Sequence, residues 1–470
     1  MMVNEYYDIN TPFKNEDIEH KLREEFQKIK KDGNFLNIRE VEEKLTNLKR
    51  WLISAPENIV YRINTLLSDS KQVLISIENE LHSQIETKGN CRKLPSIKLF
   101  ENIPELIFVS SWNDDIDLNL EIQSKEIIVD VKCGEAVIRG ADIFAPGVIG
   151  MPHGLNVGDI VSVFADIVKG CKKGLVKKYA NENKFFLGNG IVLLTRDDIF
   201  RHEIKNASGI AVKLIDVVSR LPQLNDKNFP TGWCLLQNLP SIICSRILDP
   251  QPGEIILDMC AAPGHKTSHI SALMKNKGMV IALEKNKNKL QRLKKHCENF
   301  NANNVDCFCF DSTMALINDN IEREISLGPP FLKESFDRIL LDGPCSALGQ
   351  RPQFFNTITL TQLNSHVFLQ KKLFFTAVEL VKFGGTLVYS TCTITLAENE
   401  EIVAWALRKF PVLKLQSIRN KISRMNLKNY GTSGFNIDGL TIEESDSLLR
   451  FGPESDCIGF FIACFKKEVI

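Results

Sequence analysis

The sequence lacks the features that place a protein across a membrane or on a secretory route. No stretch reaches about 18 consecutive apolar residues, the length that a membrane-spanning helix needs. The N-terminal stretch MMVNEYYDINTPFKNEDIEH contains no apolar run of the kind that signal peptides carry. These absences predict no membrane contact, and we expect the protein in the cytoplasm.

Metal, disulfide and phosphate-loop signatures are also missing. The 13 cysteines are odd in number and irregular in spacing, which is more typical of a reducing compartment than of a disulfide scaffold. They form no pair of C-x-x-C units, so we expect no metal site. The motifs G-x-G-x-x-G and G-x-x-x-x-G-K-[ST] are absent as well. With 58 basic and 58 acidic residues the net charge is zero, so only local clusters can indicate a nucleic-acid partner.

Three zones differ in composition, and 470 residues are enough for two or three domains. Residues 1–124 mix charged helical patterns at Glu16–Lys31 and Ile38–Leu52 with a strand-like run at Ile59–Asn64, and we expect an N-terminal α/β element that packs on the core. Residues 125–205 predict a small all-β barrel, because short apolar runs alternate with glycines. The expected strands of this barrel are Glu126–Val131, Ala136–Arg139, Asp159–Val168, Phe185–Leu187 and Ile191–Leu194.

We expect an α/β catalytic domain over residues 206–470. From Pro252 onward, apolar runs of strand length alternate with segments whose apolar residues have helical spacing. The expected strands are EIILDM, MVIALE, VDCFCF, DRILLD, GTLVYS and CIGFFIACF. The expected helices are Lys266–Lys275, Lys285–Phe300, Thr361–Lys382 and Leu396–Arg408. This alternation implies a mostly parallel, Rossmann-like sheet.

The turn after EIILDM is a candidate cofactor loop. Doubly wound folds bring a cofactor against backbone amides where a strand runs through small residues into a helix. The next strand ends in Glu284, where an acid can accept from the hydroxyls of a ribose, and the third ends in Asp311, where an acid can meet an adenine. Alternatively, these two acids only begin solvated helices. The residues of the turn itself are Cys260, Ala261, Ala262, Pro263, Gly264, His265 and Lys266.

Two further strands end beside a cysteine. DRILLD ends at Asp342 and is followed by Cys345, and GTLVYS is followed by Cys392, so both thiols lie at the edge where open α/β sheets build their sites. An ordinary thiol is only a few per cent thiolate at neutral pH, and a cation such as Lys266 would raise that fraction. The alternatives for this pair are a disulfide, half of a metal site or a core role. A core role is what we expect of Cys307, Cys309 and Cys464.

Such thiols suit chemistry at carbon 5 of cytosine, which is a poor nucleophile by itself. A thiolate that adds to carbon 6 makes carbon 5 enamine-like and able to attack a methylsulfonium. The reaction also needs a donor near ring nitrogen 3 and a base that removes the proton from carbon 5 afterwards.

The motifs D-x-C-A-A-P-G-x-K-T, D-x-P-C-S and S-T-C-T-x-x-x-x-E-N-E-x-x-V resemble those of the Nop/Sun family of RNA cytosine-5 methyltransferases. The resemblance is close over residues 230–410 and 457–466. It implies a Rossmann-like methyltransferase fold with Cys392 as nucleophile and Cys345 as the group that assists product release. It also implies that Asp342 and Lys266 hold the cytosine. The implied S-adenosyl-L-methionine site comprises residues 260–266 with Glu284, Asp311 and Asp342.

Two residues depart from the family pattern, because His265 and Ala347 stand where glycine is common. The side chain of His265 is expected beside the methionine end of the cofactor. There it would either crowd the cofactor or bond to its carboxylate.

Within the β zone, residues 133–147 and 186–190 resemble a PUA domain, a small pseudo-barrel that binds structured RNA. Six lysines stand against one acid, Glu182, between residues 169 and 184, enough to hold several phosphates unless they only form a solvated loop. A PUA domain inserted in a Nop/Sun enzyme resembles the branch that methylates cytosine 72 in the acceptor stem of certain tRNAs and requires the CCA end. The resemblance implies RNA contacts by Arg139, Phe144, Lys172, Lys173 and Asn189. The alternatives are the same chemistry on rRNA or mRNA, or an RNA-binding protein that has lost activity.

Overall fold

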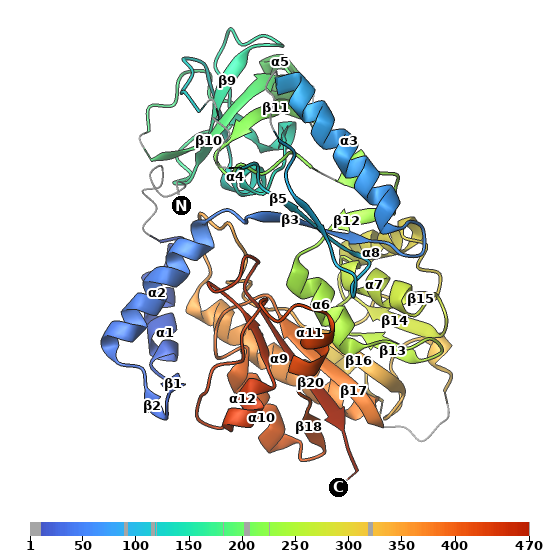
Figure 1. The fold of residues 1–470 in the computed structure, drawn as a ribbon. Coiled ribbons are helices and arrows are strands. Elements are labelled where there is room, and N and C mark those ends of the chain that lie inside the picture. The colour runs from blue at the N-terminus through green and yellow to red at the C-terminus, as the bar shows by residue number, and fades with distance from the viewer. Residues whose placement is uncertain are drawn as a thin grey trace.

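The computed structural model describes residues 11–88, 93–113, 118, 120–181, 183–201, 207–224, 226–317 and 323–469. Two helices near the N-terminus flank an α/β catalytic part, and a β module lies at the end of the molecule remote from the C-terminus (Figure 1). Within the described residues, no helix is both long enough and apolar enough to cross a membrane.

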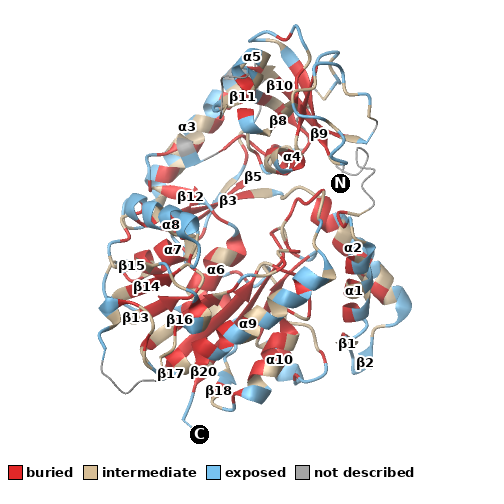
Figure 2. Ribbon diagram, turned by 180° about the vertical axis from the view of Figure 1, so that it is seen from behind, coloured by how far each residue is buried: buried red, intermediate tan, exposed pale blue. Residues whose placement is uncertain are grey.

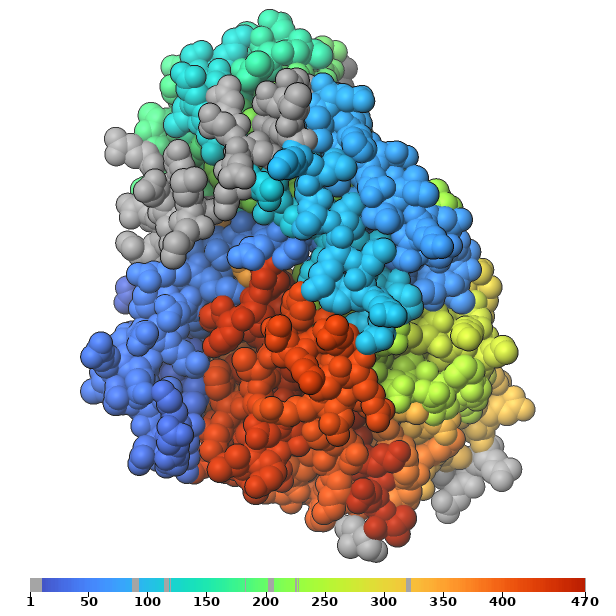
Figure 3. Space-filling view, in the orientation of Figure 1, coloured from blue at the N-terminus to red at the C-terminus, as the bar shows by residue number. Residues whose placement is uncertain are grey.

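The first two helices pack on the catalytic core. The N-terminal segment contains α1 (Glu16–Phe26), β1 (Lys30–Lys31), β2 (Asn34–Phe35) and α2 (Ile38–Ile53). α2 begins with a capping box, in which Asn37 and Glu40 each accept the other's backbone N–H. Leu22 and Leu45 lie in the same buried cluster as residues of the catalytic strands. Figure 3 shows this N-terminal segment, in dark blue, directly beside the C-terminal part of the chain, in red.

A separate four-stranded sheet joins segments from both sides of the β module. Its elements are β3 (Asn58–Ile63), α3 (Ser70–Lys88), β4 (Ile97–Leu99), β5 (Leu106–Ser110) and β12 (Cys234–Leu236), with the strand order β12-β3-β5-β4. β12 pairs antiparallel with β3, and Leu235 lies opposite Arg62. The N-terminal α/β element is therefore not confined to residues 1–124, because a strand from the expected catalytic zone completes its sheet.

The β module forms a six-stranded sheet in the order β7-β11-β10-β9-β6-β8. Its elements are β6 (Glu126–Val129), α4 (Val131–Ile138), β7 (Ile143–Phe144), β8 (Val148–Gly150), β9 (Ile160–Asp166), β10 (Lys184–Val192), α5 (Arg196–Phe200) and β11 (Ile210–Val217). The expected strand Ala136–Arg139 is wrong, because Asp130 caps a helix over this run by accepting from the backbone of Cys133. β11 also extends the module past residue 205, where we expected it to end, because it pairs with β10.

The catalytic sheet has the expected parallel core. Its strand order is β15-β14-β13-β16-β17-β20-β18, with β19 paired to β20, and β20 is antiparallel to β17. The strands are β13 (Ile255–Asp258), β14 (Met279–Leu283), β15 (Val305–Phe308), β16 (Phe336–Asp342), β17 (Val381–Thr391), β18 (Leu413–Leu415), β19 (Leu449–Phe451) and β20 (Phe460–Lys467). The helices are α6 (Leu239–Leu248), α7 (His265–Leu273), α8 (Lys287–Asn299), α9 (Leu360–Leu380), α10 (Glu400–Lys409), α11 (Arg419–Arg424) and α12 (Ile442–Asp446). Helices cover both faces, so the strands are largely buried (Figure 2). The Rossmann-like fold class predicted from sequence is confirmed.

Candidate active site

The two cysteine motifs meet at the carboxyl edge of the catalytic sheet. β16 and β17 pair in parallel, with Asp342 opposite Ser390 at their ends. The Sγ atoms of Cys345 and Cys392 lie 3.4 Å apart, within hydrogen-bond distance for sulfur. Both cysteines are free, so the alternative of a disulfide between them is wrong for this structure.

The two thiols share their proton unequally. The hydrogen bond from Cys345 lowers the pKa of Cys392 below its ordinary value, burial opposes this effect, and the charge of Lys266 adds to the lowering. The same hydrogen bond, together with burial, raises the pKa of Cys345 well above its ordinary value. The thiolate is therefore favoured at Cys392 and the proton at Cys345. Because the thiolate is the nucleophilic form, the arrangement can present a nucleophile at Cys392.

An ion pair stands beside the thiols. Lys266, in the first turn of α7, donates from Nζ to Oδ2 of Asp342 over 2.6 Å. Ser390 donates from Oγ to Oδ1 of the same carboxylate over 2.7 Å. Burial is the largest single effect on the pKa of Lys266 and lowers it, but the charge and hydrogen bond of Asp342, together with the charges of Cys244 and Cys392, outweigh burial and hold this pKa above its ordinary value. Lys266 is thus a fixed cation whose other protons can bind a substrate, and the Asp342 carboxylate is an acceptor.

The turn between β13 and α7 requires glycine at its apex. Gly264 has a φ of +111°, in the left-handed region that other residues rarely adopt. A Cβ at this position would lie 2.9 Å from the side chains of His296 and Leu293. Thr267 braces the turn by donating from Oγ1 to Oδ2 of Asp258 over 2.8 Å. The turn therefore brings the amino end of α7 to the carboxyl edge of the sheet, as the cofactor loop requires.

Acidic side chains converge on this turn from four neighbouring strands. Burial, followed by the charges of the surrounding acids, raises the pKa of Cys260 well above its ordinary value. Those acids are Asp258, Asp342, Glu284 and Asp311. One carboxylate oxygen of Glu284 and one of Asp311 accept from the backbone N–H two residues further on, at 2.7 and 3.0 Å. These two oxygens cap the following turn, as the alternative reading expected.

This acid cluster fits S-adenosylmethionine. Carboxylates accept hydrogen bonds and attract positive charge. The cofactor presents the complementary groups, namely ribose hydroxyls, an adenine amino group, an ammonium and a sulfonium. Residues 260–266 with Glu284, Asp311 and Asp342 would hold it, and when bound it supplies a methyl group on a positively charged sulfur.

The ring of His265 lies against helix α8. Its centroid is 5.1 Å from that of His296 on α8, and the His296 ring stacks on Phe300 at 4.3 Å. Burial, aided by the charge of Arg62, lowers the pKa of His265 to about 4, so the ring is neutral at pH 7. The side chain thus packs toward α8, and we expect it to leave the methionine end of the cofactor uncrowded.

Replacing His265 with glycine is therefore expected to change the dissociation constant of S-adenosylmethionine by no more than about three-fold. The loss of ring packing and a glycine in the first turn of α7 should lower the free energy of unfolding by about 1–2 kcal/mol. Calorimetric titration and denaturant unfolding measure the two effects separately. A ten-fold change in cofactor affinity would contradict this orientation of the ring.

The expected RNA-binding residues are divided between surface and interior. Lys172 and Lys173 are exposed, as are Lys177 and Lys178. Arg139 is also exposed and lines a pocket of about 300 Å³, together with residues of the catalytic part such as 456–458. The ring of Phe144 is half-buried.

Two other expectations for this surface, those for Asn189 and Lys184, need correction. Asn189 is buried, its Oδ1 accepts from Ser162 at 2.7 Å and its Nδ2 donates to the carbonyl of Glu121 at 2.8 Å, so it braces the module instead of facing RNA. Lys184 pairs with the buried Glu126 at 2.5 Å and is not available to phosphate. Lys169 lies over the ring of Phe355, 4.1 Å from its centroid. Residue 182, the acid of this run, lies outside the described residues.

Sequence reasoning missed the residues that join the two cysteine loops. Glu398 bonds to both loops, and the only signal for it was the E-N-E of the third motif. Gly349 and Gly459 touch, because a Cβ on Gly349 would lie 2.3 Å from the carbonyl oxygen of Gly459. Ala347 adopts a φ of +55°, which explains why glycine is common there in the family.

Comparisons with known proteins agree with this geometry. Residues 245–466 match the family described as 16S rRNA methyltransferase RsmB/F, and residues 125–218 match the PUA domain, including β11. The chain is 41% identical over 453 residues to the tRNA (cytosine(72)-C(5))-methyltransferase NSUN6 of Mus musculus, covering 91% of each protein. It is 31% identical to the rRNA (cytosine-C(5))-methyltransferase NOP2C of Arabidopsis thaliana, over 87% of this chain and 83% of that protein.

A solved structure resembles the whole chain. The crystal structure of NSun6 from Pyrococcus horikoshii with SFG is 25% identical, has a TM-score of 0.68, and is matched over 98% of this chain and 99% of its own. The catalytic and β parts thus occur together in a solved structure that the whole chain resembles. The chain belongs to the Nop/Sun family of RNA cytosine-5 methyltransferases, in the branch that carries an inserted PUA domain.

Proposed function

We propose that this protein methylates carbon 5 of cytosine 72 in tRNA, with S-adenosylmethionine as methyl donor. The observation that carries the proposal is the pair of thiols 3.4 Å apart beside the ion pair of Lys266 and Asp342. The mouse relative that is 41% identical over 91% of this chain is a tRNA (cytosine(72)-C(5))-methyltransferase. We also propose that the enzyme acts in the cytoplasm.

In the proposed mechanism, the thiolate of Cys392 adds to carbon 6 of the cytosine. A carbon–sulfur bond forms, and the electron pair of the 5,6 double bond makes carbon 5 nucleophilic. Lys266 places a charged donor against the side of the ring where negative charge develops, and Asp342 accepts from the exocyclic amino group. Residues 260–266 with Glu284, Asp311 and Asp342 would hold the cofactor, which would supply the methyl group to carbon 5.

Release requires a base for the proton on carbon 5. Before the reaction, the hydrogen bond with Cys392 keeps the pKa of Cys345 high, and burial adds to this effect. Once the sulfur of Cys392 is bonded to carbon, it carries no negative charge, so the pKa of Cys345 should fall and its thiol can lose its proton to solvent. Cys345, or a water beside it, then takes the carbon 5 proton. The double bond reforms, and Cys392 leaves as a thiolate.

The RNA itself would be held by the exposed lysines of the β module. A cytosine near a helix end is cheap to extrude, because unstacking costs only a few kcal/mol and less where pairing frays. The PUA module would hold the CCA end, and the pocket lined by Arg139 lies between this module and the catalytic part. The phosphates at the acceptor end would then meet Lys172 and Lys173.

Replacing Lys172 and Lys173 with alanine is expected to raise the KM for tRNA about three- to ten-fold and to reduce the salt slope of RNA binding by about one to two. The affinity for cofactor should not change, because both residues lie outside the catalytic sheet. Lys294 and Lys295, an exposed pair on α8, provide the matched control. An equal effect of the control pair, or no effect of the first pair, would contradict the assignment.

Bisulfite sequencing tests the function directly. The purified protein and cofactor are incubated with tRNA transcripts that carry cytosine 72, with the same transcripts truncated before the CCA end, and with rRNA fragments. We expect protected cytosine only at position 72 of the complete transcripts. The second candidate is rRNA methylation, which the 31% identity to an rRNA methyltransferase favours. Protection in the rRNA fragments alone would establish it and contradict the tRNA proposal.

A further inference from the structure

The fully buried carboxyl group of Glu398 lies between the two cysteine loops. Oε1 accepts from the backbone N of Ser346 at 2.9 Å and from Nε2 of Gln370 at 3.0 Å. Oε2 accepts from Oγ of Ser346 at 2.5 Å and from Oγ1 of Thr395 at 2.9 Å. One side chain thus binds the loop after β16, the loop after β17 and helix α9.

These contacts lie next to the reacting atoms. Ser346 directly follows Cys345, and its Oγ lies 2.6 Å from Oγ1 of Thr393, which directly follows Cys392. Gln370 also donates to the carbonyl of the residue before Cys345, at 3.0 Å. The chain on both sides of Cys345 is therefore attached, directly or through one side chain, to Glu398.

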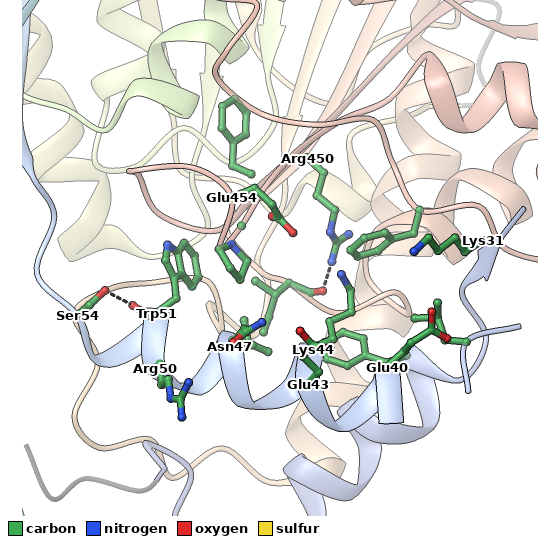
Figure 4. Close-up of a pocket in the computed structure, with 18 residues that line it drawn as sticks. Lys31, Glu40, Glu43, Lys44, Asn47, Arg50, Trp51, Ser54, Arg450 and Glu454 are labelled. Atoms are coloured by element: carbon green, nitrogen blue, oxygen red, sulfur yellow. Dashed lines mark hydrogen bonds between the residues drawn. The ribbon is translucent and has the colours of Figure 1, made fainter. Parts of the chain in front are cut away.

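The neighbours of Glu398 in the E-N-E motif hold other elements. Asn399 accepts from Oγ1 of Thr391 at 2.5 Å, within the loop of Cys392 alone. Both oxygens of Glu400 accept from Nη1 of Arg450, at 2.9 and 2.8 Å. Figure 4 shows Arg450 in the wall of a pocket that residues of α2 also line. Within the motif, Glu398 is the residue that reaches the loop of Cys345.

We propose that Glu398 is a positioning residue for product release. It holds Cys345 against the Cys392 loop so that Cys345 can accept the proton from carbon 5. This inference rests on the proposed function. The attack on carbon 6 needs only Cys392 and the ion pair, so it should tolerate a displaced Cys345 loop. Removal of the carbon 5 proton needs Cys345 itself in place.

The negative charge of Glu398 also supports a role in product release. After the hydrogen bond with Cys392 and burial, the negative charge of Glu398 contributes to the raised pKa of Cys345. That contribution persists when the thiolate of Cys392 has been consumed, and a group with a higher pKa is a stronger base once deprotonated. Glu398 thus orients Cys345 and preserves its basicity at the step where a base is needed.

The Glu398→Gln variant tests the proposal, because glutamine keeps the size of the side chain but removes its charge and replaces one acceptor oxygen with an amide donor, so the bonds accepted from Ser346 Oγ and Thr395 Oγ1 are lost. We expect kcat on tRNA to fall about ten-fold or more, with the KM for tRNA within about three-fold and the single-turnover rate of methyl transfer nearly unchanged. A denaturing gel with labelled tRNA should show accumulated covalent adduct. A merely structural role would lower attack, transfer and release together.

The matched control is Glu25→Gln. Glu25 is also fully buried and accepts from the backbone N of Leu396 in the Cys392 loop at 2.7 Å, but it does not bond to the Cys345 loop. This variant should accumulate no adduct. If Glu398→Gln fails to fold, Ser346→Ala removes the hydroxyl bonds to Glu398 and Thr393 while keeping the carboxyl group, and it should accumulate adduct as well.

The possible outcomes separate the positioning role of Glu398 from the proposed tRNA substrate. Adduct accumulation by Glu398→Gln but not by Glu25→Gln supports the positioning role. Unchanged kcat, equal loss at every step, or equal adduct in both variants overturns it. If the wild-type protein methylates an rRNA fragment and not tRNA, the proposed substrate is wrong, and the same comparison is made on that RNA.

Discussion

Cys392→Ala is expected to lower tRNA methylation by roughly 10⁴-fold or more, because the variant lacks the atom that activates carbon 5. The protein should still bind tRNA and cofactor, since the ion pair of Lys266 with Asp342 and the acid cluster remain. No covalent complex with RNA should form under any condition. A denaturing gel with labelled tRNA, with and without cofactor, measures this directly.

Cys345→Ala should fail at a different step. Its Cys392 can still add to carbon 6, and carbon 5 can then accept the methyl group, but the carbon 5 proton is left without its base. We expect one turnover followed by accumulation of a complex that survives boiling in denaturant. If both cysteines were only core residues, each variant would lose stability and neither would form an adduct. An adduct from Cys392→Ala and none from Cys345→Ala would mean that the roles are reversed.

Much of the catalytic part could be predicted because its strands are covered on both faces. Such strands are continuous apolar runs, and the expected DRILLD and GTLVYS fall within β16 and β17. Parallel pairing then places whatever follows each strand at one edge of the sheet. This rule alone was enough to predict that Cys345 and Cys392 lie close together.

Orientation and long-range pairing could not be predicted. Whether Asn189 faces the solvent or the interior depends on the register of β10 against β9, which shifts between Phe186 and Gly188, and against β11, which shifts between Asn189 and Gly190. The position of the His265 ring depends on His296, a residue of the next helix. β12 pairs with β3 across the whole inserted module, and no local pattern marks such a contact. The role of Glu398 could not be predicted because two of its partners, Ser346 and Gln370, come from segments that are remote in sequence.

Lys266→Met is the second change with a large expected effect. Methionine has a similar length and no charge, so the variant removes both the donor to the cytosine ring and the cation beside Cys392. The methylation rate at pH 7 should fall by roughly 10²- to 10⁴-fold, the range found when a positioned charged or acid–base group is lost. Single-turnover methyl transfer at saturating cofactor and tRNA is the appropriate measurement, because it excludes release.

The pH dependence of the methylation rate shows whether the loss in Lys266→Met comes from the missing charge beside Cys392. The hydrogen bond from Cys345, a hydrogen bond from Gln350 and the charge of Lys266 lower the pKa of Cys392 against the effects of burial and of the Asp342 charge. The wild-type rate should therefore fall only as pH drops below the ordinary range of a thiol. Without the lysine charge, the pKa of Cys392 rises, and the acid limb of the profile should move to higher pH. Lys266→Arg keeps a charge but not the geometry, so its rate should fall while its limb stays near that of the wild type. An unmoved limb in Lys266→Met would show that the charge does not act on the nucleophile.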